Sequence, residues 1–337
     1  MTEIIKNSSD FLFIYEAIQC NPNGDPDQEN KPRMDYDTKT NLVTDTRVKR
    51  FIRDYLKTIS KEESIFVDME GELKVSMDSK LKSVVKRIVE NEKELEKAFY
   101  NNPEGLLIYK DIIKESKNAE EVWQAITKKD FKNKDLNYEL LAYLVKEKFI
   151  DIRMFGSAFA VAGFTKAYTG PIQLNWGYSF NPVEIMDSSS IVTIMNDDSS
   201  TFGKDYRVHY SLLGFNGTIN ASSAKSTGLT NADLAIFRKA IWEAIPANPT
   251  RSKLNQYPKF YLEIIYNEGV GNGQFGDLRN YVISRPIEGK SDKQVRKFND
   301  LKLDLSKLQA VINENTGEKE IVKEIIIRTS PDMSFSL

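Results

Sequence analysis

Cysteine and histidine are nearly absent from this sequence of 337 residues, which holds one of each, Cys20 and His209. A single cysteine excludes a disulfide within the chain and a zinc site built from several cysteines. A single histidine excludes HExxH-type metal sites and any mechanism that needs two imidazoles. No GxSxG segment is present, so the sequence gives no support to a hydrolase with a serine nucleophile.

Long apolar runs are also missing. No stretch approaches the roughly 18 uncharged apolar residues that a membrane-spanning helix needs. Residues 1–10 lack the apolar run of a signal peptide, so we expect a cytoplasmic protein with no membrane partner. Hydrophobic residues make up 40% and charged residues 28% of the chain, which excludes a globally disordered or collagen-like protein.

Charge varies along the chain, although the net charge is only −2. Residues 1–30 hold six acids and one lysine, whereas residues 31–57 hold eight Lys or Arg and four acids. A phosphate-binding surface needs such a local excess of cations and does not need a high overall charge. The basic block is therefore a candidate nucleic-acid contact.

The first sixty residues predict a strand, a loop and a basic helix. The apolar residues 10–20 indicate a strand, and the residues 21–33, rich in Pro, Asn and Asp, indicate a loop. Thr44 or Asp45 can cap a helix that continues to Ile59. One side of that helix is apolar. The flank beside the apolar side carries four cations: Lys49, Arg50, Arg53 and Lys57.

Residues 61–149 differ from the rest, because they are dense in charges of both signs and have thin apolar stripes. They predict a helical insertion that packs as its own small unit. A short hairpin is expected at residues 65–75. It is followed by four predicted helices: 78–100, 104–117, 119–129 and 135–149.

The later part of the chain predicts strands at residues 171–180, 206–220 and 260–269 and a helix at 230–244. Residues 187–205 surround a short apolar run with polar and small residues, as an exposed hairpin arm would. The order β–α–insertion–β–β–α–β predicts an α+β fold. Its core is an expanded ferredoxin-like, RNA-recognition-like arrangement.

The loop after the first strand admits two metal interpretations. Its alternating Asn and Asp residues suggest a calcium loop, but glycine stands fourth instead of sixth and proline replaces the closing glutamate. Its acids could also form a two-metal nuclease cluster, but they lie in one loop and alternate with Lys31 and Arg33. We therefore expect a structured turn with no metal. The acids concerned are Asp25, Asp27, Glu29, Asp35 and Asp37.

Two further features are assigned structural roles. The glycine-rich residues 269–276 lack the Walker lysine and predict a flexible turn. Trp123, Trp176 and Trp242 each fit packing in the core or on a helix face. Neither feature points to a catalytic or cofactor site.

Two more basic segments, one at Arg153 and one at Arg251 and Lys253, lie next to Gly or Pro. Arginine forks, lysines and backbone amides that converge on one sheet edge suit a sugar–phosphate backbone. The residues alone leave three classes open: an RNA-binding scaffold, a metal-dependent ribonuclease and a generic helical interaction module.

Six segments, in this order along the chain, resemble the repeated backbone subunit of type I CRISPR Cascade complexes. That subunit belongs to the Cas7 family, and the subtype I-B (Csh2) branch is the most similar one. The resemblance extends from about residue 10 to residue 266. The segments are 21–35, 44–56, 151–156, 169–173, 203–217 and 250–253.

The resemblance implies an RNA-recognition-like palm of residues 1–60 and 150–337, helical fingers at 61–149 and a thumb hairpin at 187–205. It implies a scaffold for antiviral defence that is not an enzyme, has no cofactor and binds crRNA in head-to-tail copies. The other implied partners are target DNA bound through the guide, the large subunit, the five-prime-end capping subunit and the repeat-processing nuclease. In related type III backbone subunits a loop aspartate cleaves target RNA, and this activity is the alternative function.

The predicted RNA-binding residues come from all of these basic segments. They are Asn23, Lys31, Arg33, Lys49, Arg50, Arg53, Arg153, Phe155, Gly156, Lys204, Arg251 and Lys253. In the thumb, Met195 or Phe202 is expected to wedge against an unstacked base.

Overall fold

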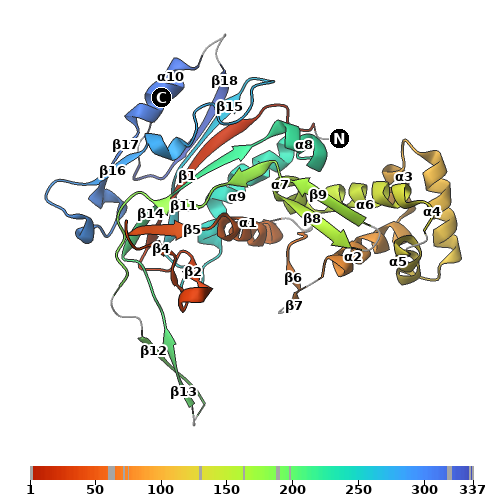
Figure 1. Ribbon diagram of the computed structural model, residues 1–337, viewed down its shortest axis with the longest axis horizontal. Coiled ribbons are helices and arrows are strands. Elements are labelled where there is room, and N and C mark those ends of the chain that lie inside the picture. Colours follow the sequence, from red (N-terminus) through yellow and green to blue (C-terminus); the bar gives the residue numbers. More distant parts are fainter. Residues whose placement is uncertain are drawn as a thin grey trace. The chain divides into compact units, whose positions relative to one another are not determined.

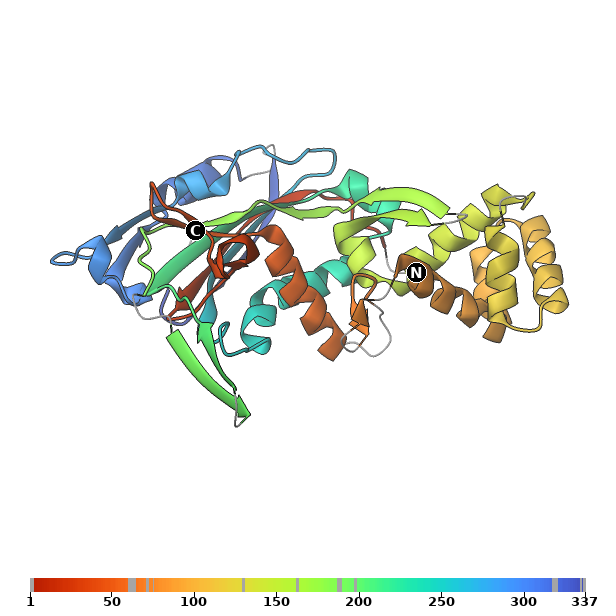
Figure 2. The same ribbon diagram turned by 60° about the horizontal axis from the view of Figure 1, so that its bottom comes forward.

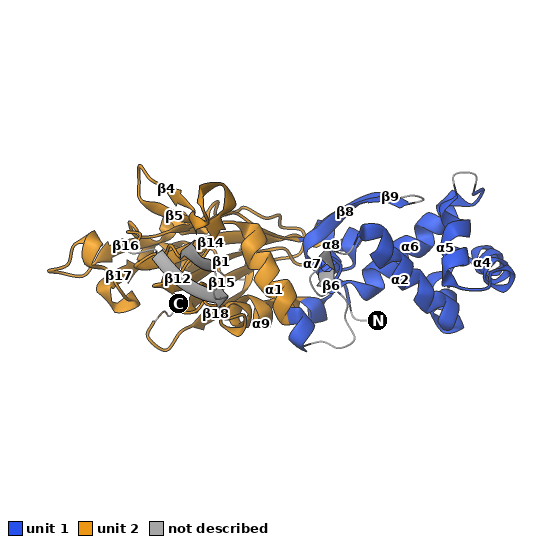
Figure 3. Ribbon diagram, turned by 90° about the horizontal axis from the view of Figure 1, so that it is seen from below, with its two compact units in different colours: residues 1–4, 56–171, 223–233 blue, residues 5–55, 172–222, 234–337 orange. Residues whose placement is uncertain are grey.

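The computed structural model divides into two compact units (Figure 3). Unit 1 comprises residues 1–4, 56–171 and 223–233, and unit 2 comprises the remaining ranges. No helix among the described residues is both long enough and apolar enough to cross a bilayer. The described residues are 3–59, 65–70, 73–74, 76–128, 131–161, 164–186, 190–196, 199–316, 321–333 and 335.

Unit 2 is built on an antiparallel sheet (Figure 1). Four of its strands have the order β15-β1-β14-β11, with helix α1 (Asp45–Ile59) after β1 and helix α9 (Asn231–Ala247) after β14. The predicted α+β fold, an antiparallel sheet with helices, is confirmed. The strands of the sheet, in spatial order, are β18 (Val322–Thr329), β15 (Gln256–Tyr266), β1 (Ser9–Ile18), β14 (Tyr210–Ile219), β11 (Gly177–Ser179), β5 (Thr40–Val43) and β4 (Met34–Asp35), and β10 (Ile172–Leu174) also pairs with β14.

Strand β1 is apolar along most of its length because both of its faces are covered. The Phe11 ring packs edge-on against Phe237 of α9, with 5.7 Å between the ring centres. On the other face, Leu12 and Ile14 belong to a core cluster that includes Leu308 of the C-terminal helix. Figure 2 shows α1 and α9 on one side of the sheet and the C-terminal elements on the other.

The C-terminal elements lie beyond the last predicted strand. A two-stranded ribbon and a helix pack on the face of the sheet opposite α9, and β18 extends the sheet at its edge. Their bounds are β16 (Ile283–Pro286), β17 (Leu301–Asp304) and α10 (Ser306–Glu314). Short 3-10 turns lie at Leu278–Tyr281, Asp292–Gln294 and Phe298–Asp300.

Unit 1 contains the predicted helical insertion, with one correction. Residues 78–100 form two helices instead of one, because Asn91 ends the first and its side-chain oxygen accepts a hydrogen bond from Lys93 N at 3.2 Å. The elements are β6 (Met69–Glu70), β7 (Leu73–Lys74), α2 (Met77–Glu90), α3 (Glu92–Ala98), α4 (Pro103–Glu115), α5 (Ala119–Thr127), α6 (Lys134–Lys148), α7 (Ile150–Phe155), β8 (Gly156–Val161), β9 (Phe164–Thr169) and most of α8 (Ala221–Thr227).

Two other predictions concern the strands of unit 2. The strand predicted at residues 171–180 is two short strands, β10 and β11, which both pair with β14 and are separated by Asn175 and Trp176. The predicted arm at 187–205 contains an antiparallel pair, β12 (Ser190–Asn196) and β13 (Ser199–Lys204). The side chains of Met195 and Phe202 lie outside what the structure describes.

Gly217 allows a close approach in the middle of the sheet and gives a test of its packing. Gly217 of β14 faces Phe11 of β1, and a Cβ at Gly217 would lie 2.2 Å from the Phe11 ring. We expect Gly217→Ala to lower the free energy of unfolding by about 1–3 kcal/mol, because the buried ring has to move. Chemical denaturation measures the change.

The matched control is Gly271→Ala, because a Cβ at Gly271 would meet no atom within 4 Å. This variant should unfold at the same denaturant concentration as the parent chain. Equal stability of the two alanine variants would contradict the packing described for β1 and β14.

Candidate nucleic-acid interface

The loop after β1 carries several of the predicted residues, and Asn23 holds it in place. The Asn23 side-chain oxygen accepts hydrogen bonds from Thr44 N at 2.9 Å and from Thr44 Oγ1 at 3.0 Å. The Asn23 backbone oxygen accepts one from Arg33 N at 3.0 Å. Thr44 precedes α1, so Asn23 joins both arms of the loop to the start of that helix. Asn23 therefore positions the surface through its own intramolecular bonds.

The acids of the loop make local hydrogen bonds, as a structured turn requires. Asp25 Oδ1 accepts from Asp27 N at 3.2 Å, and Asp35 Oδ1 accepts from Asp37 N at 3.1 Å. The bond from Thr38 Oγ1 lowers the pKa of Asp35. In the described part of the chain, no three His, Cys, Asp or Glu side chains are grouped so that they could hold a metal ion.

Arg33 lies between an acid and an exposed aromatic ring. Its Nη1 pairs with Asp25 Oδ2 at 3.1 Å, and its guanidinium carbon is 6.0 Å from the centre of the Trp176 ring. The Nε of Arg33 is buried and has no hydrogen-bond partner among the described residues. One donor of this side chain is therefore still unmatched.

Lys31 and Lys204 are both linked to Tyr206, Lys31 through the ring and Lys204 through Glu29, which Lys204 and Tyr206 share as a partner. The Lys31 ammonium is 5.1 Å from the centre of the Tyr206 ring. Glu29 accepts from Lys204 Nζ at 2.7 Å and from the Tyr206 hydroxyl at 3.0 Å, and these bonds lower the pKa of Glu29. The pair is exposed, so solvent and salt screen it.

The predicted basic flank of α1 is largely neutralised within the helix. Lys49 pairs with Asp45 at 3.0 Å, and Arg50 pairs with Asp54 at 2.6 Å. Arg53 is half-buried. Pairs of this spacing on a helix contribute only a few tenths of a kcal/mol, about 0.3–0.5 each, so phosphate could replace the acids at small cost.

Arg47, one turn before Phe51 on α1, is a further candidate that the sequence patterns did not single out. Its guanidinium carbon is 4.0 Å from the centre of the Phe51 ring, and its Nε has no partner among the described residues. Burial lowers the pKa of Arg47. An arginine four residues before an aromatic residue was the available signal, because such residues share a helix face.

Lys253 lies close enough to Arg47 for the two charges to repel. Burial, and after it the charge of Arg47, lowers the pKa of Lys253 to about 8. The Lys253 ammonium donates to the backbone oxygen of Asn21. Among the described residues no carboxylate forms an ion pair with either cation. Asp205, whose charge raises the pKa of Lys253, is itself paired with Arg207 at 2.7 Å.

Buried polar groups surround these two cations. The hydroxyl of Tyr15 is fully buried and has no partner among the described residues, and burial raises its pKa. The Asn21 side-chain oxygen is likewise unmatched there. Burial raises the pKa of the Cys20 thiol to about 12, so Cys20 brings no negative charge at neutral pH. The end of β1 thus combines two cations with two unmatched donors, Arg47 Nε and the Tyr15 hydroxyl, which an anion would match, and one unmatched acceptor, the Asn21 oxygen, which an anion would not match.

Arg207 links the segment that contains Arg251 and Lys253 to the start of the loop after β1, because it bonds both. Its guanidinium donates to the backbone oxygen of Gln19 at 3.0 Å and to that of Arg251 at 3.2 Å. The Arg251 side chain itself is 63% exposed and lies 3.4 Å from Asp205. Unit 2 therefore gathers most of the predicted residues: Asn23, Lys31, Arg33, Lys49, Arg50, Arg53, Lys204, Arg251 and Lys253.

Arg153, Phe155 and Gly156 belong to unit 1, where Phe155 is buried. Arg153 is buried and makes a two-pronged pair with Asp233, at 3.0 Å and 2.8 Å. Gly156 has φ +70°, and a Cβ there would lie 2.1 Å from the oxygen of Tyr168. Arg153 and Gly156 are thus accounted for by the packing of unit 1.

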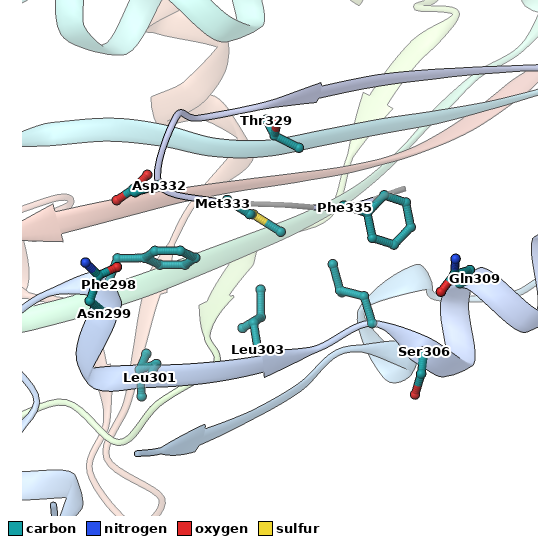
Figure 4. Close-up of a pocket in the computed structure, with 11 residues that line it drawn as sticks. Phe298, Asn299, Leu301, Leu303, Ser306, Gln309, Thr329, Asp332, Met333 and Phe335 are labelled. Carbon is teal, nitrogen blue, oxygen red and sulfur yellow. The ribbon is translucent and has the colours of Figure 1, made fainter. Parts of the chain in front are cut away.

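Unit 2 also contains a cavity of about 670 Å³ at its C-terminal elements (Figure 4). The carboxylate in its lining, Asp332, pairs with Lys259 at 2.6 Å. The lining holds no Lys or Arg, so the cavity does not suit a phosphate chain. The lining residues are Phe298, Asn299, Leu301, Leu303, Leu305, Ser306, Gln309, Thr329, Asp332, Met333 and Phe335.

Comparison with known proteins gives a consistent set of relatives. The family model described as "CRISPR-associated protein Cas7" matches residues 7–306. The "CRISPR-associated protein Cas7" of Haloferax volcanii is 28% identical over 309 residues, which cover 90% of this chain and 82% of the relative.

Two chains from solved structures are also similar, although both likenesses are weak. A chain from a "CRISPR RNA-guided surveillance complex, pre-nicking" has a TM-score of 0.46 and 11% identity, and the match covers 77% of this chain and 79% of that chain. A chain from a "CRISPR RNA-guided surveillance complex" has a TM-score of 0.40 and 12% identity, with 77% of each chain covered.

The buried pair in unit 1 predicts a large effect on stability. Arg153→Ala leaves the Asp233 carboxylate buried without its main partner, and we expect a loss of about 3–5 kcal/mol in the free energy of unfolding. The control is Lys86→Ala, which removes an exposed pair with Glu90 and should cost about 1 kcal/mol or less. Urea unfolding followed by circular dichroism measures both. If the two variants were equally stable, the structural role of Arg153 would be wrong.

Proposed function

The chain belongs to the Cas7 family of CRISPR-associated proteins, and we propose that it is a backbone subunit that binds the guide RNA of a Cascade surveillance complex. The observation that carries the proposal is the pair of half-buried cations, Arg47 and Lys253, at the end of β1. The likeness to the Haloferax Cas7 protein over 90% of the chain supports it.

A phosphate group would resolve the unfavourable charges of this pair. Two like charges in a partly buried place repel, and burial, followed by the charge of Arg47, lowers the pKa of Lys253. A phosphate would neutralise both cations. It would also supply acceptors to Arg47 Nε and to the Tyr15 hydroxyl, the two unmatched donors nearby. The two cations, which repel each other in the free protein, would then both stabilise the bound RNA.

The rest of the surface extends this contact without reading sequence. Lys204 and Arg251 are exposed, and Lys31 and Arg33 lie on the same loop of unit 2. Cations that meet phosphates fix the register of a strand and carry no base preference. Sequence is then read by pairing between the guide and its target, as in other RNA-guided complexes.

The finer assignments follow from the resemblance of the chain to the subtype I-B branch. Residues 1–60 and 150–337, which include unit 2, act as the palm, residues 61–149 act as the fingers, and residues 187–205 act as the thumb. Copies bind head to tail along the guide, with Met195 or Phe202 of the thumb against an unstacked base. Such an interface repeats without closing. The complex works in the cytoplasm with target DNA, the large subunit, the five-prime-end capping subunit and the repeat-processing nuclease.

We further propose that the subunit is not an enzyme. The alternative is target-RNA cleavage by a loop aspartate with a bound metal. Asp25 and Asp35 are the acids of the loop with the most local bonds, and those bonds support a structural role. A two-metal nuclease needs carboxylates that are directed at a shared ion.

The first prediction from this function concerns catalysis. Incubation of the protein with guide, matched RNA and magnesium should leave the RNA at full length, because the loop acids are engaged in turns. Gel electrophoresis of end-labelled RNA measures it. Cleavage that Asp25→Ala or Asp35→Ala abolishes would establish the nuclease function instead.

The second prediction concerns pH. In the free protein Lys253 loses its proton near pH 8, whereas a bound phosphate favours the protonated form. RNA affinity should therefore fall as the pH rises from 7 to about 9.5, because above the free pKa binding has to take up a proton. Fluorescence anisotropy with labelled single-stranded RNA measures the affinity.

Two variants make this test specific. Lys253→Arg keeps its charge and should remove most of the decline, whereas Lys204→Arg, at a lysine whose pKa is raised by Glu29, should leave it unchanged. Arg47→Ala should weaken binding to all sequences alike and reduce the log–log salt slope by roughly 0.7. A decline of the same size in the Lys253→Arg protein would remove Lys253 from the phosphate contact.

A further inference from the structure

Trp176 is not packed in the core or on a helix face, as the sequence pattern predicts for all three tryptophans. Its side chain is 50% exposed, whereas Trp123 is 5% exposed. Trp176 lies between β10 and β11, the two short strands beside β14. A large aromatic ring that is half exposed leaves apolar surface in contact with water, which is unfavourable unless a ligand or partner covers the ring.

The backbone around Trp176 is held firmly, so the ring is presented in a fixed place. Asn175 N donates to the oxygen of Asn216 at 2.9 Å, and Arg279 Nη1 donates to the oxygen of Trp176 at 2.6 Å. A Cβ at Gly177 would lie 2.3 Å from the ring of Phe215, so position 177, next to Trp176 in the sequence, admits only glycine. Three neighbouring constraints thus fix one exposed ring.

Arg279, which holds the Trp176 carbonyl, is itself fixed. It is 7% exposed, and its guanidinium carbon is 4.0 Å from the centre of the Tyr178 ring. Asp277 accepts two of its donors, at 2.6 Å and 2.9 Å. The support of Trp176 is therefore a packed ion pair and not a mobile loop.

One neighbour of the Trp176 ring is Arg33, a cation of the proposed RNA surface. Arg33 lies 6.0 Å from the centre of the ring and keeps an unmatched, buried Nε. Gln173, three residues before Trp176, accepts from Lys49 of α1 at 3.3 Å. An aromatic ring beside a guanidinium group suits a nucleotide, whose base stacks while its phosphate meets the cation.

We propose that Trp176 is a stacking platform for one unstacked base of a single-stranded nucleic acid, with Arg33 beside it as the phosphate contact. The inference rests on the proposed function, since it places a base on the same unit that holds the phosphate-binding pair. Arg33 beside the ring supplies a cation for the phosphate of a nucleotide stacked on Trp176, and this favours a nucleotide as the occupant. Stacking of this kind accepts any base.

The experiment compares the full-length protein and its Trp176→Ala variant on three strands of one length. These are an RNA, a DNA, and an RNA whose bases are replaced by abasic spacers. Trp176→Ala should weaken binding to the base-bearing strand by about tenfold, the effect of one lost base–aromatic stack. It should leave binding to the abasic strand unchanged. A larger effect on RNA than on DNA assigns the platform to the guide, and the reverse assigns it to the target strand.

Two controls separate stacking from damage to the fold. Trp176→Phe keeps an aromatic face and should retain most of the affinity. Tyr100→Ala removes a ring that is 83% exposed on the helical insertion and should change nothing. Quenching of a fluorescent base analogue in the strand should occur with the parent protein and with Trp176→Phe, and should be lost with Trp176→Ala.

The outcomes distinguish this inference from the function on which it rests. If the parent protein binds none of the strands, the proposed function fails. Stacking is refuted if the parent protein binds and Trp176→Ala binds every strand as tightly as the parent does. It is also refuted if Trp176→Ala loses as much affinity for the abasic strand as for the base-bearing strands. Loss of self-association with unchanged RNA affinity would show that a protein covers Trp176.

Discussion

The burial of β1 on every side is the constraint on which unit 2 depends. The strand pairs with β14 on one edge and with β15 on the other, and helices cover one face while the C-terminal elements cover the other. A strand so enclosed cannot shift without breaking both pairings and both cores. The loop that leaves β1 therefore starts from a fixed point. This is why Lys253 and Arg47, far apart in the sequence, lie close enough near its end for their charges to interact.

The charges around that loop fall into two groups with different consequences. Most of the cations are paired with nearby acids, which partly neutralise the basic block where it lies. Such pairs are weak and screened, so an RNA strand can displace the acids. Arg47 and Lys253 have no acid to displace among the described residues, and binding strength should be concentrated there. The surface pairs are Arg33–Asp25, Lys49–Asp45, Arg50–Asp54 and Lys204–Glu29.

Local patterns were sufficient for most elements of the fold and for the family. The apolar run at residues 10–20, the helix after Thr44 and the mixed-charge helices of the insertion each depend on neighbours within a few residues, which periodicity and capping report. The α+β fold is confirmed, and the resemblance to Cas7 is confirmed by the family model over residues 7–306. The bonds of Asp25 and Asp35 within the loop were also predictable, because they reach only two residues along the chain.

The sequence by itself determined where the cations are, and only the tertiary structure decided which of them are available. Arg153 looked like a phosphate contact, but α9 brings Asp233 to it, and the pair is buried. Arg47 looked ordinary, but the segment before β15 brings Lys253 close enough for the two charges to interact. Trp176 gave no sign of exposure, because burial depends on whether another segment covers the ring. Pairing and covering are set by the strand order of the sheet, and no spacing along the chain records that order.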